Sequence, residues 1–340
     1  MMTRRELVPT RRELALTRRE LVKGIAAGAA AASVRAEASG AVLRAADVHP
    51  GNYPTVAAVQ WIDAQLRERF GGEIALTIYH SGVLGSEKDT LDLARIGALA
   101  VTRVHSSVLN NALPVTRILS LPYVFDSTEH MRRAFDGSFG DAILAGCAER
   151  GLLGLAIYDS GSRNFYNTRR AVETPRDLHG LKLRVPQSDI FMESVAALGA
   201  SPTPLAYGAV FSSLQTHLID GAENNWPSYY TSRHFEMARH WSETEHAYAP
   251  DMLLMSKRVA DALPAEQREF LVATARRSVT LMRERWDETV RASRQSVLDA
   301  GATVRAVDKA AFKQAVQPLL DRYLRDPSIR ALYDELRGFA

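Results

Sequence analysis

The chain has 340 residues, more than a single hydrophobic core usually supports, so two lobes are expected. Its hydrophobic content of 46% and charged content of 24% are typical of a globular protein, and no apolar run is long enough to span a bilayer. Eight of the 42 Lys/Arg residues and four of the 39 Asp/Glu residues lie in residues 1–38. The rest of the chain therefore has 34 basic and 35 acidic residues, a net charge of −1. This charge excludes the broad positive surface that nucleic-acid binding requires.

Residues 1–38 have the features of an export signal. Arginine pairs precede a weakly hydrophobic stretch at 24–34, and residues 36–38 (Ala-Glu-Ala) follow it as a small-residue cleavage pattern. Residues 17–23 (Thr-Arg-Arg-Glu-Leu-Val-Lys) resemble a twin-arginine signal. We therefore predict cleavage before Ser39 and a periplasmic mature protein. An amphipathic N-terminal helix is the alternative, but its alanine-rich face would be a poor membrane anchor.

After the export signal, the sequence predicts a helix, a strand and a second helix in this order. Pro54 favours a helix start, and apolar residues at spacings of three and four form one buried face: Val56, Val59, Ile62, Leu66 and Phe70. Gly71 and Gly72 end this helix. Residues 73–78 alternate polar and apolar as in a half-buried strand, after which Ser86 caps a helix that ends near Gly97.

Two further strands are predicted at 151–158 and 181–185. Each is followed by loop or cap residues and then by helix-forming sequence. This repeated strand–helix order predicts an α/β fold, in which ligands gather at the carboxyl ends of the strands.

Residues 265–300 contain neither Pro nor Gly, and their apolar residues keep helical spacing. One helix of this length would extend about 50 Å, longer than a single lobe is wide. We expect it to brace two lobes that move about a hinge, whereas a break near 283–285 would give two ordinary helices. Lobe I should then comprise 39–160 and about 249–288, and lobe II 161–248 and about 289–340 with the C-terminal helices.

The sequence lacks the motifs of common enzyme classes. It contains no nucleophile elbow, zinc-protease motif, phosphate loop or Gly-x-Gly-x-x-Gly. His234 and His240 lie six residues apart in a segment predicted to be helical, on different faces, which argues against a shared metal. The single cysteine, Cys147, is expected to pack as a small hydrophobe in a helix-like context. We therefore expect neither enzyme activity nor a cofactor or metal.

Two arginines lie in or just after the predicted strands. Arg163 follows the strand at 151–158, and Arg184 lies inside the strand at 181–185. A buried guanidinium needs an anion, and a bidentate carboxylate is its natural partner. The partner of Arg184 could be a ligand carboxylate or an internal acid such as Glu223, or an edge strand could leave Arg184 in solvent.

Five motifs occur in the order 84–88 (Leu-Gly-Ser-Glu-Lys), 121–125 (Leu-Pro-Tyr-Val-Phe), 177–186 (Asp-Leu-His-Gly-Leu-Lys-Leu-Arg-Val-Pro), 199–204 (Gly-Ala-Ser-Pro-Thr-Pro) and 219–224 (Ile-Asp-Gly-Ala-Glu-Asn). In this order they resemble the DctP-type solute receptors of tripartite ATP-independent periplasmic (TRAP) transporters. The resemblance extends from about His49 to the C-terminal helices. It implies a two-lobed periplasmic-binding-protein fold that closes on a small organic acid about a hinge, with a TRAP permease as its membrane partner.

The resemblance also implies which residues bind the ligand. Arg184 corresponds to the family arginine that binds the ligand carboxylate, and Arg163 matches a second arginine near that anion. Asn224 matches a ligand-binding asparagine, Tyr207 an aromatic ligand contact and Glu87 an acidic one. Packing in the core is the alternative for Tyr207, and a solvated first-turn position is the alternative for Glu87.

Residues 49–55 (His-Pro-Gly-Asn-Tyr-Pro-Thr) and 102–104 (Thr-Arg-Val) resemble the branch of the family that binds hexuronates such as glucuronate or galacturonate. A sugar acid needs donors and acceptors for its hydroxyls, which could be supplied by His49, Glu87, Arg103 and Asn225. As alternatives, His49 caps the following turn, Arg103 forms a rim salt bridge and Asn225 caps a helix.

Other ligands and roles fit the same sequence. The carboxylate could belong to a 2-oxo or hydroxy acid, a dicarboxylate or an aromatic acid. The fold could also serve as a ligand-loaded sensor subunit for a receptor kinase. A periplasmic enzyme acting on a sugar acid would need an acid, base, metal or nicotinamide site, and the sequence shows none.

Overall fold

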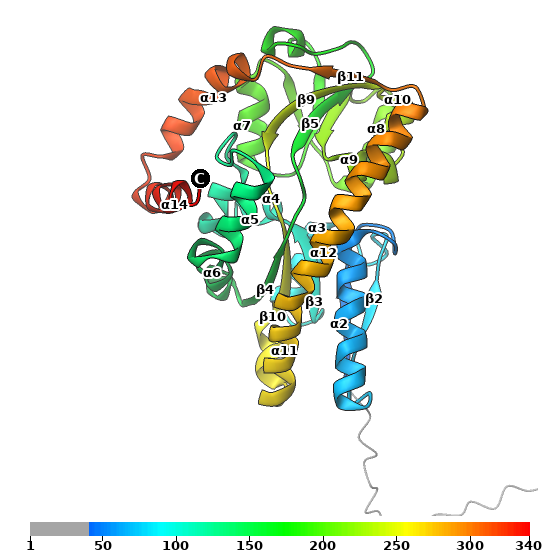
Figure 1. Ribbon diagram of the computed structural model, residues 1–340, viewed down its shortest axis with the longest axis vertical. Helices are drawn as coiled ribbons and strands as arrows, with labels where there is room; N and C mark the ends of the chain where they lie inside the picture. The colour runs from blue at the N-terminus through cyan, green and yellow to red at the C-terminus, as the bar shows by residue number, and fades with distance from the viewer. Residues whose placement is uncertain (1–40) are drawn as a thin grey trace, which may run out of the picture. The chain divides into compact units, whose positions relative to one another are not determined.

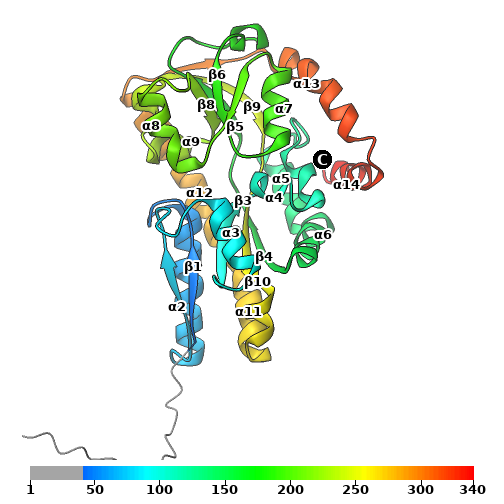
Figure 2. The same ribbon diagram turned by 180° about the vertical axis from the view of Figure 1, so that it is seen from behind.

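The computed structural model describes residues 41–340, and the predicted export signal at 1–38 lies outside them. The described residues form two β-sheets with helices packed on them (Figures 1 and 2). We call the first sheet with its helices lobe I and the second sheet with its helices lobe II. The predicted two-lobed α/β fold is confirmed.

The sheet of lobe I contains, in spatial order, β2 (Ile74–Tyr79), β1 (Ala41–Ala46), β3 (Val101–His105), β10 (Asp251–Ser256) and β4 (Leu152–Tyr158). β2 and β3 pair parallel with β1, whereas β10 runs antiparallel between β3 and β4. Both faces of β10 are buried: Met252 and Leu254 pack in one core, and Leu253 and Met255 in another. Helices therefore cover both faces of this sheet.

The sheet of lobe II contains, in spatial order, β11 (Thr303–Ala306), β9 (His240–Ala247), β5 (Arg163–Asn167), β8 (Gly221–Asn224), β6 (Lys182–Val185) and β7 (Ser201–Pro204). β7 and β8 are parallel to β6, and β5 is antiparallel to β8 and β9. The prediction of one helical segment from His234 to His240 is wrong. The short helix α10 (His234–Met237) stops because the chain leaves it to pair with β5 and β11.

The first predicted elements are confirmed. α2 (Pro54–Phe70) starts at its proline and ends at Gly71, whose φ of 59° suits glycine. α3 (Glu87–Arg95) is capped by Ser86, which forms a capping box with Asp89. This cap fixes Glu87 in the first turn of α3.

The predicted long helix is continuous as α12 (Ala265–Asp299) and crosses both lobes (Figure 1). Leu271 and Trp286 pack in the core of lobe I, and Val297 packs in the core of lobe II. The alternative with a break near 283–285 is therefore wrong. The chain also passes from lobe I to lobe II at 159–162 and returns at 248–250, so two short connections and one long helix join the sheets.

The other helices are short. Lobe I carries α4 (Ser106–Leu109), α5 (Thr128–Asp136), α6 (Ser138–Gly146) and α11 (Lys257–Ala262), with the 3₁₀ helices η1 (Pro114–Ser120) and η2 (Cys147–Arg150). Lobe II carries α7 (Asp189–Ala197), α8 (Val210–Gln215), α9 (Trp226–Thr231), α10 and α13 (Lys309–Tyr323), with η3 (Pro175–Leu178) and η4 (Tyr207–Ala209). In the part of the chain that is described, no helix is both long and apolar enough to cross a membrane.

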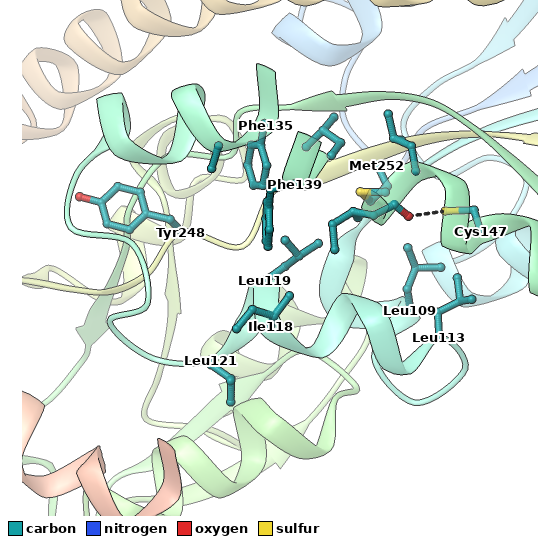
Figure 3. Packing of buried hydrophobic residues seen from close by; sticks show 14 of the residues in the cluster. Leu109, Leu113, Ile118, Leu119, Leu121, Phe135, Phe139, Cys147, Tyr248 and Met252 are labelled. Atoms are coloured by element: carbon teal, nitrogen blue, oxygen red, sulfur yellow. Dashed lines mark hydrogen bonds between the residues drawn. The ribbon is translucent and has the colours of Figure 1, made fainter. Parts of the chain in front are cut away.

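Cys147 packs as predicted in a core of lobe I with residues of α5, α6 and η1 (Figure 3). Its Sγ donates to the carbonyl of Ile143 at 3.6 Å, and burial raises the pKa of the thiol to about 12. The last helix, α14 (Pro327–Arg337), buries Ile329 and Leu336 in this same core. The C-terminal helices were expected in lobe II, but only α13 packs there, because the apolar side chains of α14 are buried on lobe I.

Candidate ligand-binding site

A cavity brings together side chains from the facing edges of the two sheets. Its empty space is about 340 Å³, including the solvent at its mouth. The cavity is lined by His49, Glu87, Arg103, His105, Arg163, Arg184, Pro186, Tyr207, Asn224, Ser228 and Asp251. Every residue predicted to bind the ligand lines this cavity except Asn225.

These side chains meet because strand ends converge at the cavity. His105 is the last residue of β3 and Asn224 the last of β8, so both lie at carboxyl ends of strands that have parallel neighbours. β10 and β5 run in the opposite direction, so their first residues, Asp251 and Arg163, reach the same edges. Strand polarity therefore concentrates polar groups between the lobes.

Arg184 is buried without a carboxylate partner. Its side chain is 4% exposed, and Nε and Nη2 both donate to the carbonyl of Leu205, at 2.9 and 2.7 Å. Within residues 41–340 no acidic side chain lies within salt-bridge distance of this guanidinium. Burial lowers the pKa of Arg184, which reflects the cost of a desolvated cation. The position therefore suits an anionic ligand.

Arg163 differs from Arg184 because an internal acid neutralises it. Arg163 Nε and Nη2 donate to the two carboxylate oxygens of Glu223 at 2.5 and 2.8 Å. Nη1 donates to Asn224 Oδ1 at 3.2 Å and lies 3.2 Å from His105 Nε2. Burial raises the pKa of Glu223, but the nearby Arg163 holds that pKa below its ordinary value. Glu223 was one possible partner of Arg184 in the sequence analysis, but in the structure Glu223 pairs with Arg163.

Arg103 is surrounded by carboxylates rather than exposed at a rim. The side chain is 1% exposed, and Nη1 donates to Glu87 at 2.6 Å and to Asp251 at 3.3 Å. Nη2 donates to Asp47, which extends from the end of β1. Neither the rim salt bridge suggested for Arg103 nor the solvated position suggested for Glu87 is correct, because Glu87 turns inward to bind Arg103 and the backbone N–H of His105.

His49 and Tyr207 both line the cavity, and their rings pack against each other. Their ring centroids are 5.0 Å apart, and His49 belongs to lobe I while Tyr207 opens η4 of lobe II. Burial and the nearby Arg103 lower the pKa of His49 to about 3, so its ring is neutral. The Tyr207 hydroxyl binds Ser232. This aromatic pair is therefore a contact between the two lobes at the wall of the cavity.

Asn225 does not line the cavity. Its Oδ1 accepts from the backbone N–H of Ser228 at 2.8 Å, and its Nδ2 donates to the carbonyl of Ser160 at 2.8 Å. The residue is the N-cap of α9, so the helix-cap alternative is the correct one. The neighbouring Asn224 does reach the cavity, where its Oδ1 accepts from Arg163.

Sequence reasoning missed several residues of the site, among them Asp251 and His105. These two lie opposite each other in the antiparallel register of β10 and β3. Asp251 precedes four buried apolar residues, and an acid at the start of a buried strand was a usable signal. Asp47 and Ser228 gave weaker signals, because only the fold brings them to Arg103 and the cavity.

Comparisons with known proteins identify the family to which this chain is similar. Residues 45–326 match the DctP family, described as bacterial extracellular solute-binding protein, family 7. A TRAP periplasmic solute binding protein from Bradyrhizobium sp. BTAi1, in complex with α/β-D-galacturonate, is 45% identical with a TM-score of 0.86, covering 88% of this chain and 100% of that chain. Another from Xanthobacter autotrophicus Py2, with bound β-D-galacturonate, is 44% identical with a TM-score of 0.85, covering 87% and 99%.

A solute-binding protein from Chromohalobacter salexigens is 36% identical over 86% of this chain and 87% of its own length. The family match and this relative each cover most of the chain. The chain therefore belongs to the DctP family of bacterial extracellular solute-binding proteins.

Proposed function

We propose that the protein is an extracytoplasmic receptor that binds a hexuronic acid and delivers it to a TRAP permease. Arg184 carries this proposal: it is a buried cation at the cavity wall, and the described chain supplies no acid to neutralise it. A ligand carboxylate offers two acceptor oxygens of the geometry that a guanidinium prefers. Arg163 and Asn224 lie on the same wall and add donors near that anion.

The hexuronate part of the proposal draws on the rest of the cavity. Carboxylate oxygens around Arg103, with the imidazole of His49 and the hydroxyl of Ser228, provide the acceptors and donors that several sugar hydroxyls require. A plain dicarboxylate has no hydroxyl groups to hydrogen-bond with this set of donors and acceptors. The structural neighbours with bound galacturonate or glucuronate support the same ligand class.

Binding would be completed by closure of the lobes. Residues from both sheets line the cavity, and the connections at 159–162 and 248–250 with α12 are where the lobes can rotate. Closure removes water from the anion and strengthens each charged hydrogen bond. Each hydrogen bond of this kind contributes roughly 1.5–3 kcal/mol to the free energy of binding. Two arginines and several neutral contacts can then reach micromolar affinity after association costs. The closed form is the state that would dock on the permease.

A thermal-shift screen tests this function directly. Protein lacking residues 1–38 would be unfolded and refolded to remove ligand carried through purification, then screened with D-glucuronate, D-galacturonate, aldonates, dicarboxylates, 2-oxo acids and aromatic acids. We expect the two hexuronates to raise the unfolding midpoint, because a ligand that binds only the native state stabilises it. A shift with another acid class alone would reject the hexuronate. No shift with any acid would reject the carboxylate receptor.

A further inference from the structure

Asp251 is a cavity residue whose hydrogen-bonding capacity is largely unused. It is the first residue of β10 and is 2% exposed. Its Oδ1 accepts one hydrogen bond, from Arg103 at 3.3 Å, and its Oδ2 has no hydrogen-bond partner among residues 41–340. Because the residue lines the cavity, this oxygen is available to a ligand.

The charges around Arg103 do not balance. One guanidinium contacts three largely buried carboxylates, those of Asp47, Glu87 and Asp251, at the wall of a cavity that is proposed to receive a further anion. Such an excess of buried negative charge favours the binding of a proton by one of the three.

Asp251 is the carboxylate least stabilised as an anion. Asp47 accepts from the backbone N–H of His49 at 2.9 Å, from the hydroxyl of Thr55 at 2.8 Å and from Arg103. Glu87 accepts from Arg103 and from the backbone N–H of His105. Asp251 has one long contact with the same guanidinium, so the proton is best placed on Asp251.

The pKa shifts of Asp251 and Asp47 agree with a proton on Asp251. Burial raises the pKa of Asp251 to about 7; Arg103 and, more weakly, Arg163 on β5 oppose the shift, while Glu87 and Asp47 reinforce it. Burial is the largest single influence on Asp47 and raises its pKa, but Arg103 and His49 together outweigh burial, so the pKa of Asp47 is lowered.

The other titratable neighbours do not change charge near neutral pH. Burial lowers the pKa of His49 to about 3 and that of His105, on β3, well below its ordinary value. Tyr158, opposite Asp251 on β4, has its pKa raised by burial. Proton binding between pH 6 and 8 is therefore assigned to Asp251.

We infer that Asp251 is a specificity-determining ligand contact, an inference that rests on the proposed function. The free carboxyl oxygen of Asp251 hydrogen-bonds a hydroxyl of the sugar acid. The Asp251 side chain carries a proton in the complex. The proton comes from solvent, so ligand binding above neutral pH is accompanied by proton uptake. As a carboxylic acid, Asp251 can donate to one hydroxyl oxygen and accept from another group, which an anion cannot do.

Isothermal titration calorimetry with D-glucuronate and D-galacturonate tests this inference. Titrations at pH 7.5–8 in buffers of different ionisation enthalpy give the number of protons taken up per ligand. For the wild type we expect uptake of a substantial fraction of a proton and a Kd that rises by up to about tenfold per pH unit above pH 7. Asp251→Asn, which has the same shape and cannot ionise, should bind without proton uptake and with a Kd nearly independent of pH.

Asp251→Ala separates the hydroxyl contact from the proton. It should raise the Kd of both hexuronates about tenfold at pH 6, where the wild type is protonated, with the fold checked by the unfolding midpoint of the apo protein. Affinity unchanged by Asp251→Ala, or proton uptake unchanged by Asp251→Asn, overturns the inference while leaving the receptor in place. Wild type that binds neither hexuronate overturns the proposed function and this inference with it.

Discussion

Glu223 binds Arg163 with both carboxylate oxygens, at 2.5 Å from Nε and 2.8 Å from Nη2. This bidentate pair is fully buried, and it gives one of the two arginines near the proposed ligand carboxylate an internal counterion. Arg184, on β6, has only the carbonyl of Leu205 as a partner among the described residues. The two arginines therefore have different roles: Arg163 is held in a fixed orientation, and Arg184 is available to neutralise an anion.

Arg184→Ala should abolish hexuronate binding and change the unfolding midpoint of the apo protein by no more than a few degrees. The variant loses the two hydrogen bonds from Arg184 to the carbonyl of Leu205, but it also removes the desolvation cost of a buried cation without a counterion. The two effects on the stability of the apo protein oppose each other. Calorimetric titration and thermal unfolding of the same samples measure both effects. Arg169→Ala, at an exposed arginine near Asp220, is the matched control and should bind normally. A large loss of apo stability in Arg184→Ala would make Arg184 structural.

Glu223→Gln should destabilise the protein by about 3–5 kcal/mol, because it leaves the buried Arg163 without its counterion. Urea unfolding at pH 7 measures the change in free energy. Asp261→Asn is the control: its partner Lys257 is 2.6 Å away, a similar distance, but both side chains are about half exposed, so the expected loss is under about 1 kcal/mol. Equal losses in the two variants would contradict a structural role for the Glu223–Arg163 pair.

Much of the fold could be predicted because its signals are local. The start of α2 at Pro54, its end at Gly71 and the continuity of α12 depend on residues adjacent in sequence. The insertion of β10 between β3 and β4 could not be predicted, since its uniformly apolar sequence does not specify a partner a hundred residues away. The return of α14 to lobe I is also non-local, as it depends on which core accepts Ile329.

The site was predicted less completely than the fold. Arg184 was found because an arginine inside an apolar strand is unusual. Asp251 was missed, since its importance depends on its position beside Arg103, which only the antiparallel register creates. The residue type and sequence position of Asn225 fitted a ligand contact and a helix cap equally well. The structure shows that Asn225 is the N-cap of α9.

Asp251 should make the free energy of unfolding of the apo protein fall as pH rises from about 5 to 7. Its ordinary pKa is 3.8 and burial raises it to about 7, so in this window the folded state holds a proton that the unfolded chain has released. The slope is at most about 1.4 kcal/mol per pH unit and vanishes above the folded pKa.

The buried histidines contribute the opposite slope below about pH 6.5, because their folded pKa values are lowered. The difference between wild type and Asp251→Asn therefore isolates the effect of Asp251. Urea unfolding at pH 5, 6, 7 and 8 measures both curves. Parallel curves would show that Asp251 has the same protonation in the folded and unfolded states.

Tyr53→Phe should accelerate ligand release. The Tyr53 hydroxyl lies 2.8 Å from Ser228 Oγ and joins the start of α2 in lobe I to α9 in lobe II. If the lobes separate before the ligand leaves, this bond stabilises only the closed state. Its loss of about 0.5–1.5 kcal/mol should raise the dissociation rate constant about two- to tenfold.

Tyr158→Phe is the matched control for this release experiment. Its hydroxyl lies 2.7 Å from Ser278 Oγ, a contact between β4 and the part of α12 packed on lobe I. That bond does not change when the lobes separate, so the variant should lose stability without changing the dissociation rate. Stopped-flow displacement of bound D-glucuronate, followed by tryptophan fluorescence, measures both variants. Equal acceleration in both would mean that Tyr53 acts through general stability, whereas acceleration in Tyr53→Phe alone supports a contact between the lobes that retains the ligand.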